Sequence, residues 1–178
     1  MEVDEEGTRS ILPKYRTLSD RNTRKGVTGS DRPGRKGTSF MFTVLAQLNW
    51  LAILVAFIVS AALAAVYFPV LIAKPYAVAL GRQDAPSIKG TPVSNLGPVV
   101  CVLLITITSA VLLRAMDVTD VGEAVVFALI VGVGYLTVMT FQIAINPNFP
   151  RPLLYGLINA PYFILSSILT AIIVTLIR

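Results

Sequence analysis

Residues 152–177 read PLLYGLINAPYFILSSILTAIIVTLI and contain no charged side chain. A helix of about 20 residues crosses the roughly 30 Å hydrocarbon core of a bilayer, so this stretch is long enough to span it. Three further stretches are also free of charge and rich in Leu, Ile, Val, Ala and Phe: residues 37–73, 90–113 and 124–150. A soluble domain of 178 residues could not bury four such segments. The pattern predicts an all-α polytopic membrane protein with a bundle of four transmembrane helices.

The composition divides the chain into a basic tail and an apolar domain. Residues 7–40 carry nine Lys and Arg side chains against two Asp, with Gly, Ser, Thr and Pro between them. A segment with so few large apolar residues cannot bury enough surface to offset the entropy of ordering it. We therefore expect a disordered basic cytoplasmic tail over residues 1–40 and a transmembrane domain over residues 41–178. The expected spans are residues 45–68, 97–113, 124–145 and 152–177.

The distribution of cations predicts the orientation. With a cytoplasmic N-terminus, the inside holds eleven Lys and Arg residues, nine in the tail plus Arg114 and Arg178. The outside then holds four, namely Lys74, Arg82, Lys89 and Arg151. Cytoplasmic segments of membrane proteins carry the excess of Lys and Arg, so we expect a multi-pass protein with both termini in the cytoplasm. The identity of the membrane stays open.

The basic tail also predicts a class of partner. Cations near a membrane surface attract anionic lipid by about 1 kcal/mol each. The tail has no recognisable nucleic-acid-binding fold and no interleaved aromatic residues. We therefore expect the bilayer, and anionic lipid at the tail, as partners, and no nucleic acid.

The loop after the first span contains signals for a short helix at the membrane surface. The segment 74–80 is mildly apolar, begins with Lys74-Pro75 and is followed by Gly81. Proline suits the first turn of a helix, and glycine suits the position just after its end. We expect a short interfacial helix here.

Few residues suit catalysis or metal binding. The chain contains no His, and its single Cys, Cys101, lies in an apolar stretch. Three carboxylates, Asp117, Asp120 and Glu123, stand close enough in sequence to suggest a divalent cation site. The spacing of Asp120 and Glu123 better fits a capping box at the start of the third span. We expect no catalytic residue, no cofactor and no metal.

Small residues recur every four positions in two spans. Such spacing places them on one helical face, where backbones approach closely. We expect these residues to pack helices together, within the chain or between two copies of it. They are Ala52, Ala56, Ser60, Ala64, Ala124, Ala128 and Gly132.

A possible polar site lies around Pro161, inside the fourth span. Proline has no N–H, so it leaves the carbonyl of Leu157 without its helical donor and is expected to kink the helix. Gln142 and Asn159 are the span residues that are most costly to expose to lipid. We therefore expect both to face the interior, and any ligand or water-filled cavity to lie beside Pro161.

Two function classes fit these observations. The first is a non-enzymatic packing, accessory or regulatory component of a membrane assembly, with a membrane protein or a second copy as partner. The alternative is a facilitative transporter or channel for a small neutral solute, lined by Gln142, Asn159 and nearby hydroxyls. A proton relay would require charged residues within the spans, and no Asp, Glu, Lys or Arg lies there.

From about residue 47 onward the chain resembles the DUF1761 family, small four-helix membrane proteins of unknown function. The resemblance rests on Asn49-Trp50 at the start of the first span and Tyr67-Phe68-Pro69 at its end. Further matching elements are Lys74-Pro75-Tyr76, Gly122, Phe149-Pro150-Arg151-Pro152 and Leu157-Ile158-Asn159-Ala160 with Tyr162. The sequence departs from the family pattern at Val66, where Trp is usual, and at Pro161, where Gly is usual. The resemblance implies the architecture and no activity.

Overall fold

The computed structural model describes residues 43–85 and 90–177. All regular structure in these two ranges is helical, which confirms the predicted all-α class. Four helical segments there are long and apolar enough to cross a membrane: Trp50–Leu71, Pro92–Ala115, Val121–Ala144 and Pro152–Leu176. The protein is therefore a multi-pass membrane protein. The predicted basic tail, residues 1–40, lies outside the described residues.

The first span is α2 (Trp50–Val66), continued by the π-helical turn η1 (Tyr67–Leu71). Asn49 caps its start, because its side-chain oxygen accepts from the N–H groups of Leu51 and Ala52 at 3.0 and 3.2 Å. The sequence placed the end of the span at Phe68, but the helical path continues past Pro69. A π turn accommodates the proline, as the N–H of Ile72 bonds to the carbonyl of Tyr67, five residues back, at 3.0 Å.

The short helix that the sequence predicted is present as α3 (Ala73–Ala79). Gly81 ends it with a φ of +64°, a conformation that glycine adopts without a steric penalty. A Cβ at Gly81 would lie 3.0 Å from Cγ of Pro150. This turn therefore packs directly against the loop that precedes the fourth span.

The second span is α4 (Pro92–Ala115), which begins five residues earlier than residue 97, where the sequence placed it. Thr91 caps it by accepting the N–H of Ser94 at 3.2 Å, and Pro92 occupies the first turn. A threonine cap followed by proline is a helix-start signal, and the sequence interpretation assigned this segment to the loop.

The third span consists of α5 (Val121–Leu129), the π-helical segment η2 (Ile130–Thr137) and α6 (Val138–Ala144). Asp120 is its N-cap, as predicted, and its carboxylate accepts from the N–H groups of Gly122 and Glu123 at 2.7 and 3.2 Å. A carboxylate at this position also interacts favourably with the helix dipole.

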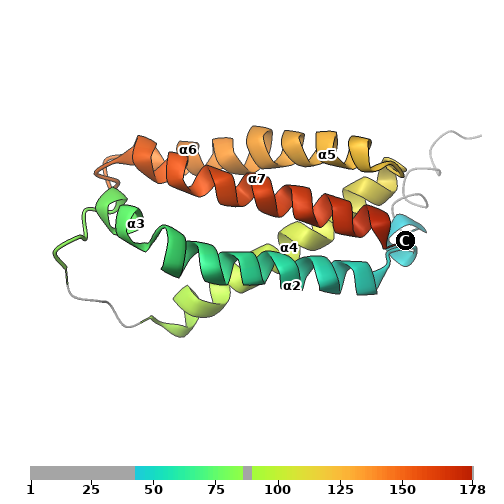
Figure 1. Ribbon diagram of the computed structural model, residues 1–178, viewed down its shortest axis with the longest axis horizontal. Helices are drawn as coiled ribbons and strands as arrows, with labels where there is room; N and C mark the ends of the chain where they lie inside the picture. The colour runs from blue at the N-terminus through green and yellow to red at the C-terminus, as the bar shows by residue number, and fades with distance from the viewer. Residues whose placement is uncertain (1–42, 86–89, 178) are drawn as a thin grey trace, which may run out of the picture. The chain divides into compact units, whose positions relative to one another are not determined.

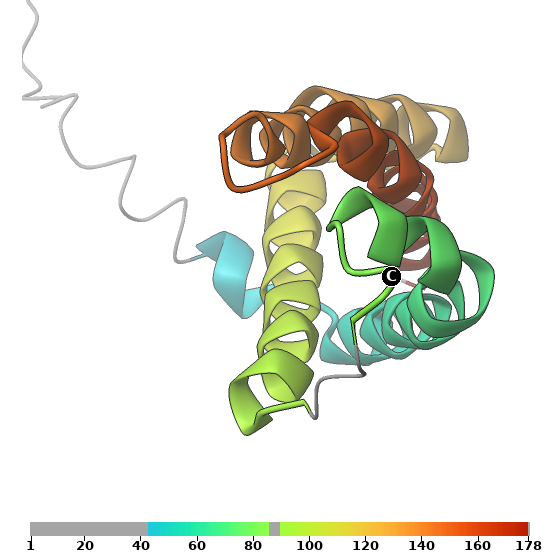
Figure 2. The same cartoon turned by 90° about the vertical axis from the view of Figure 1, so that its left-hand side faces the viewer.

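The fourth span, α7 (Pro152–Leu176), is the central helix of the domain. Figure 1 shows α7 between the α5–α6 span and α2, and α7 packs against every other span. The main contacts of α4 are with α2 and α7. Figure 2, turned by 90°, shows α4 crossing at an angle to the other helices.

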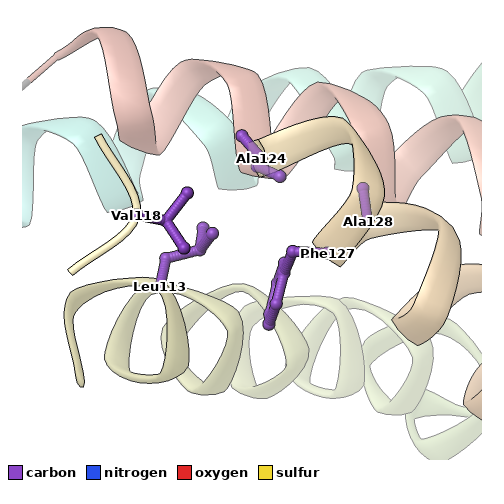
Figure 3. Packing of buried hydrophobic residues seen from close by; sticks show 6 residues of the cluster. Leu113, Val118, Ala124, Phe127 and Ala128 are labelled. Atoms are coloured by element: carbon purple, nitrogen blue, oxygen red, sulfur yellow. The ribbon is translucent and has the colours of Figure 1, made fainter. Parts of the chain in front are cut away.

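Two clusters of buried hydrophobic side chains lie at one end of the domain. In Figure 3, Val118 of the link after α4 points toward Leu113 of α4, and the ring of Phe127 of α5 points toward α4. A second cluster, Leu48, Ile53 and Ala110, adjoins the first, since partly buried Val174 packs against both. The buried residues of α4 all lie at or after position 106. The first half of α4, residues 92–105, therefore adds nothing to this core.

Candidate functional site: an apolar cleft between α2, α4 and α7

The small residues singled out in the sequence lie between helices of the same chain. Six of them are buried, and Ala64 is half-buried. In α2, Ser60 is fully buried and its hydroxyl lies 3.2 Å from that of Thr170 on α7. A Cβ at Gly132 would lie 3.0 Å from the backbone of Ile164 on α7. Both small-residue faces thus pack against α7.

The prediction that Gln142 faces the interior is wrong, because its side chain is exposed on α6. The cause is the π segment η2. Gly132 and Thr137, five residues apart, are both buried, and the Thr137 hydroxyl donates to the Gly132 carbonyl at 2.7 Å. Each π turn contains an extra residue and rotates everything after it. The buried residue of α6 is consequently Ala144, and residues two apart do not share a helix face.

Asn159 does lie in the interior, with only 3% of its surface exposed. Its side-chain amide donates to the carbonyl of Tyr155 in its own helix at 2.6 Å. This hydrogen bond lies within α7 and does not involve Gln142. Pro161 is exposed, and the nearby hydroxyl of Tyr67 donates to the carbonyl of Ile158 at 2.8 Å, one residue beyond Leu157.

A cleft of about 550 Å³ opens where the first half of α4 stands away from α2 and α7. Its walls come from positions 61–68 of α2 and η1, 98–106 of α4 and 155–166 of α7, with Tyr76 of α3 and Leu136 of η2. Of the three residues beside which any cavity was expected, Asn159 lines this cleft. Gln142 and Pro161 are not among its lining residues.

Aromatic rings line the cleft at its α3 end. The ring of Phe68 contacts that of Tyr162 at a centroid distance of 5.0 Å and that of Tyr76 at 6.0 Å. Tyr76 in turn lies 5.6 Å from Tyr155, and their hydroxyls are 3.4 Å apart. No prediction from the sequence included this aromatic group. Its signal was the gathering of tyrosine and phenylalanine at the matching ends of the first and fourth spans.

Polar groups in the cleft wall are mostly engaged within the chain. The buried hydroxyl of Thr106 donates to the carbonyl of Val102 at 2.8 Å, and Asn159 donates to Tyr155. Burial, followed by the hydrogen bond with Tyr155, raises the pKa of Tyr76 well above its ordinary value, while Arg82 acts in the opposite direction. Tyr76 is therefore neutral at physiological pH. The wall offers a ligand mainly carbon surface.

A smaller cavity of about 150 Å³ lies at the opposite end, near the start of α2 and the end of α7. Arg114 lines it and donates to the side-chain oxygen of Gln47 at 3.1 Å. Asn49 also lines it and donates to the carbonyl of Ile177 at 3.0 Å. This cavity is smaller than the roughly 300–1,000 Å³ that is typical of small-molecule sites.

The comparison with protein families gives one match. Residues 51–175 match the model of a family described as "Protein of unknown function (DUF1761)". No curated protein and no solved structure matches the chain. The matched range contains all four membrane-spanning segments almost completely, and it contains every residue that lines the cleft. The chain therefore belongs to the DUF1761 family, as its resemblance to that family predicted.

Proposed function

We propose that this protein is a non-enzymatic component of its membrane, and that its working part is the cleft between α2, α4 and α7. The cleft binds an apolar chain that enters sideways from the bilayer. We also propose that both termini are cytoplasmic, on the strength of the eleven-to-four distribution of Lys and Arg.

The observation that carries this proposal is the position of α4. Its first half has no buried residue, although its second half is packed into the core. A cleft of about 550 Å³ results, which is within the roughly 300–1,000 Å³ typical of small-molecule sites. In a membrane the open side of this cleft faces hydrocarbon, so a lipid-like molecule reaches it without crossing water.

The lining residues support a binding role rather than catalysis. Among the side chains that line the cleft, those that can ionise are three tyrosines and Cys101. General acid–base chemistry near neutral pH uses groups whose pKa lies close to 7, and phenols are far from that range.

The lining also favours an apolar ligand over a small neutral solute. A polar solute would exchange its hydrogen bonds with water for contacts with carbon, because Thr106 and Asn159 are already bonded within α4 and α7. Transport remains the competing function. Flux of a neutral solute into vesicles that contain only the pure protein, with no protection of the cleft by apolar chains, would favour it.

The small-residue faces do not supply a surface for a protein partner, because α7 covers them within the chain. If the protein has an accessory role in a membrane assembly, we propose that it acts on that assembly through the molecule bound in the cleft. The exposed faces of the spans contact lipid by default.

Cys101 provides a direct test, because it lines the cleft and is the single cysteine of the chain. The full chain is purified in mild detergent, and the rate at which an alkyl methanethiosulfonate modifies Cys101 is measured by intact mass. A neutral long-chain alcohol at ten times its dissociation constant is expected to slow the reaction about tenfold, by simple mass action.

The matched control places the cysteine one residue away in the same turn, about 100° around the helix. Val100 is 53% exposed and does not line the cleft. Val100→Cys in a Cys101→Ala background is expected to react at a rate that the alcohol leaves unchanged. Equal slowing at both positions would show general partition into the micelle and would overturn the proposal.

A further inference from the structure

Two arginines lie just beyond the aromatic end of the cleft. Tyr155 lines the cleft, and its N–H donates at 3.0 Å to the carbonyl of Arg151, the residue just before the start of α7. Tyr76 also lines the cleft, and the charge of Arg82 is close enough to act on its phenol. Each of these two tyrosines therefore has an arginine near it on the outer side.

The two arginines share one rim of the domain. The turn at Gly81 packs on Pro150, since a Cβ at Gly81 would lie 3.0 Å from Cγ of Pro150. Arg82 and Arg151 follow these two contacting residues directly. Both arginine side chains are exposed, so both guanidinium groups are available to a ligand at the rim.

The rim is positively charged in the part of the chain that the structure describes. Residues 69–85 and 145–151 carry three cations, Lys74, Arg82 and Arg151, against one anion, Asp84, which leaves a net charge of +2. Guanidinium groups bind phosphate and carboxylate through paired, charge-assisted hydrogen bonds. An apolar cleft with two such groups at its end matches a molecule with one apolar and one anionic part.

We propose that the occupant of the cleft is an anionic lipid, with an acyl chain between α2, α4 and α7 and its headgroup between Arg82 and Arg151. This inference rests on the proposed function and adds the charge of the ligand to it. The tyrosine pair lies at the junction, where the hydroxyls of Tyr76 and Tyr155 meet the start of the headgroup. Amphipathic rings favour this level of a membrane.

Lys74 gives a control on the same short helix. Its side chain is exposed, and it lies two residues from Tyr76, so the two do not share a face of α3. A general attraction of the surface for anions would involve Lys74 as much as the arginines. A specific headgroup site would involve the arginines alone.

The experiment compares two single-chain lipids with the same acyl chain, lysophosphatidylglycerol and lysophosphatidylcholine. The full-length protein is used in mild detergent, and the concentration that half-protects Cys101 from the thiol reagent is measured for each lipid. The anionic lipid is expected to bind at least about fivefold more tightly, the effect of one cation near an anionic headgroup.

The variants assign this preference to residues. Arg82→Gln with Arg151→Gln is expected to abolish the preference, and continued protection of Cys101 by lysophosphatidylcholine in this variant shows that it is folded. Lys74→Gln is expected to keep the preference in full.

The possible failures are distinguishable. If both lipids protect Cys101 equally in the wild type, the anionic headgroup site is wrong and the proposed cleft function stands. If neither lipid protects Cys101, the proposed function itself fails. If Lys74→Gln weakens the preference as much as the arginine pair does, the attraction is general and the headgroup site is again overturned.

Discussion

Asn49, at the start of the first span, donates a 3.0 Å hydrogen bond from its side-chain amide to the carbonyl of Ile177, at the end of the fourth span. The oxygen of the same side chain accepts the N–H groups of Leu51 and Ala52. One residue thus caps α2 and also ties it to the C-terminal end of α7. The family resemblance drew attention to this position, and the structure gives it a physical role.

Replacing Asn49 by Ala removes the cap and the link to Ile177 together. We expect a loss of about 1–3 kcal/mol of stability, the combined range for a helix cap and a partly buried hydrogen bond. Asn49→Asp keeps a capping oxygen and lacks the donor, so we expect a smaller loss. Thermal unfolding in one detergent measures both. Equal stability of the two variants and the wild type would contradict the role assigned to Asn49.

Gly132 and Gly134 give a matched pair in the third span. A Cβ at Gly132 would meet the α7 backbone at 3.0 Å, whereas a Cβ at Gly134 would meet nothing within 4 Å. We expect Gly132→Ala to destabilise the protein by about 1–3 kcal/mol through overpacking. Gly134→Ala should be neutral or slightly stabilising. Thermal unfolding in detergent checks both, and a greater loss at Gly134 would contradict this packing of η2 on α7.

The exposed Gln142 and the buried Asn159 should behave differently. Gln142→Leu removes no contact with the interior, so we expect a change in unfolding free energy within about 0.5 kcal/mol. Asn159→Leu removes the hydrogen bond to Tyr155 from a buried position, and we expect a loss of about 1 kcal/mol. Thermal unfolding of both variants and the wild type in the same detergent tests these two expectations. A large loss at Gln142 with none at Asn159 would reverse their assigned positions.

The orientation can be tested with two exposed positions, Asp84 in the first loop and Thr119 in the link before the third span. Each is changed to Cys in a Cys101→Ala background and labelled in intact cells with a reagent that does not cross membranes. We expect Asp84→Cys to be labelled and Thr119→Cys to be protected, because one span separates them. Labelling of both would contradict the topology, and labelling of Thr119→Cys alone would invert it.

The four spans could be predicted because each is a continuous stretch of sequence without charged residues. The cap at Asp120 and the helix end at Gly81 also depend on a few neighbouring residues of the sequence, and the structure contains both. Gln142 was misplaced because it was assigned to the interior from the cost of exposing its amide to lipid, and that cost does not indicate which face of the helix the residue occupies. The π segment η2 changes the phase of the helix by one residue, and no charge or proline marks it in the sequence.

The cleft itself was only partly predictable. Asn159 and Pro161 indicated its neighbourhood, but its volume depends on the angle at which α4 crosses α2 and α7 (Figure 2). That angle results from packing around Leu113 and Ala110 at the far end of α4. Contacts between distant segments of this kind leave no signature in local composition.

Photolabelling in a bilayer tests the cleft most directly. A neutral long-chain alcohol with a diazirine near the middle of its chain is activated in vesicles that contain the full-length protein, and the labelled residues are located by peptide mass spectrometry. We expect adducts to concentrate on cleft-lining positions such as Ala61, Val102 and Ile105, and to be sparse at exposed Ile58 and Leu104, which lie outside the cleft. Adducts spread evenly over all exposed positions of the four spans would contradict it.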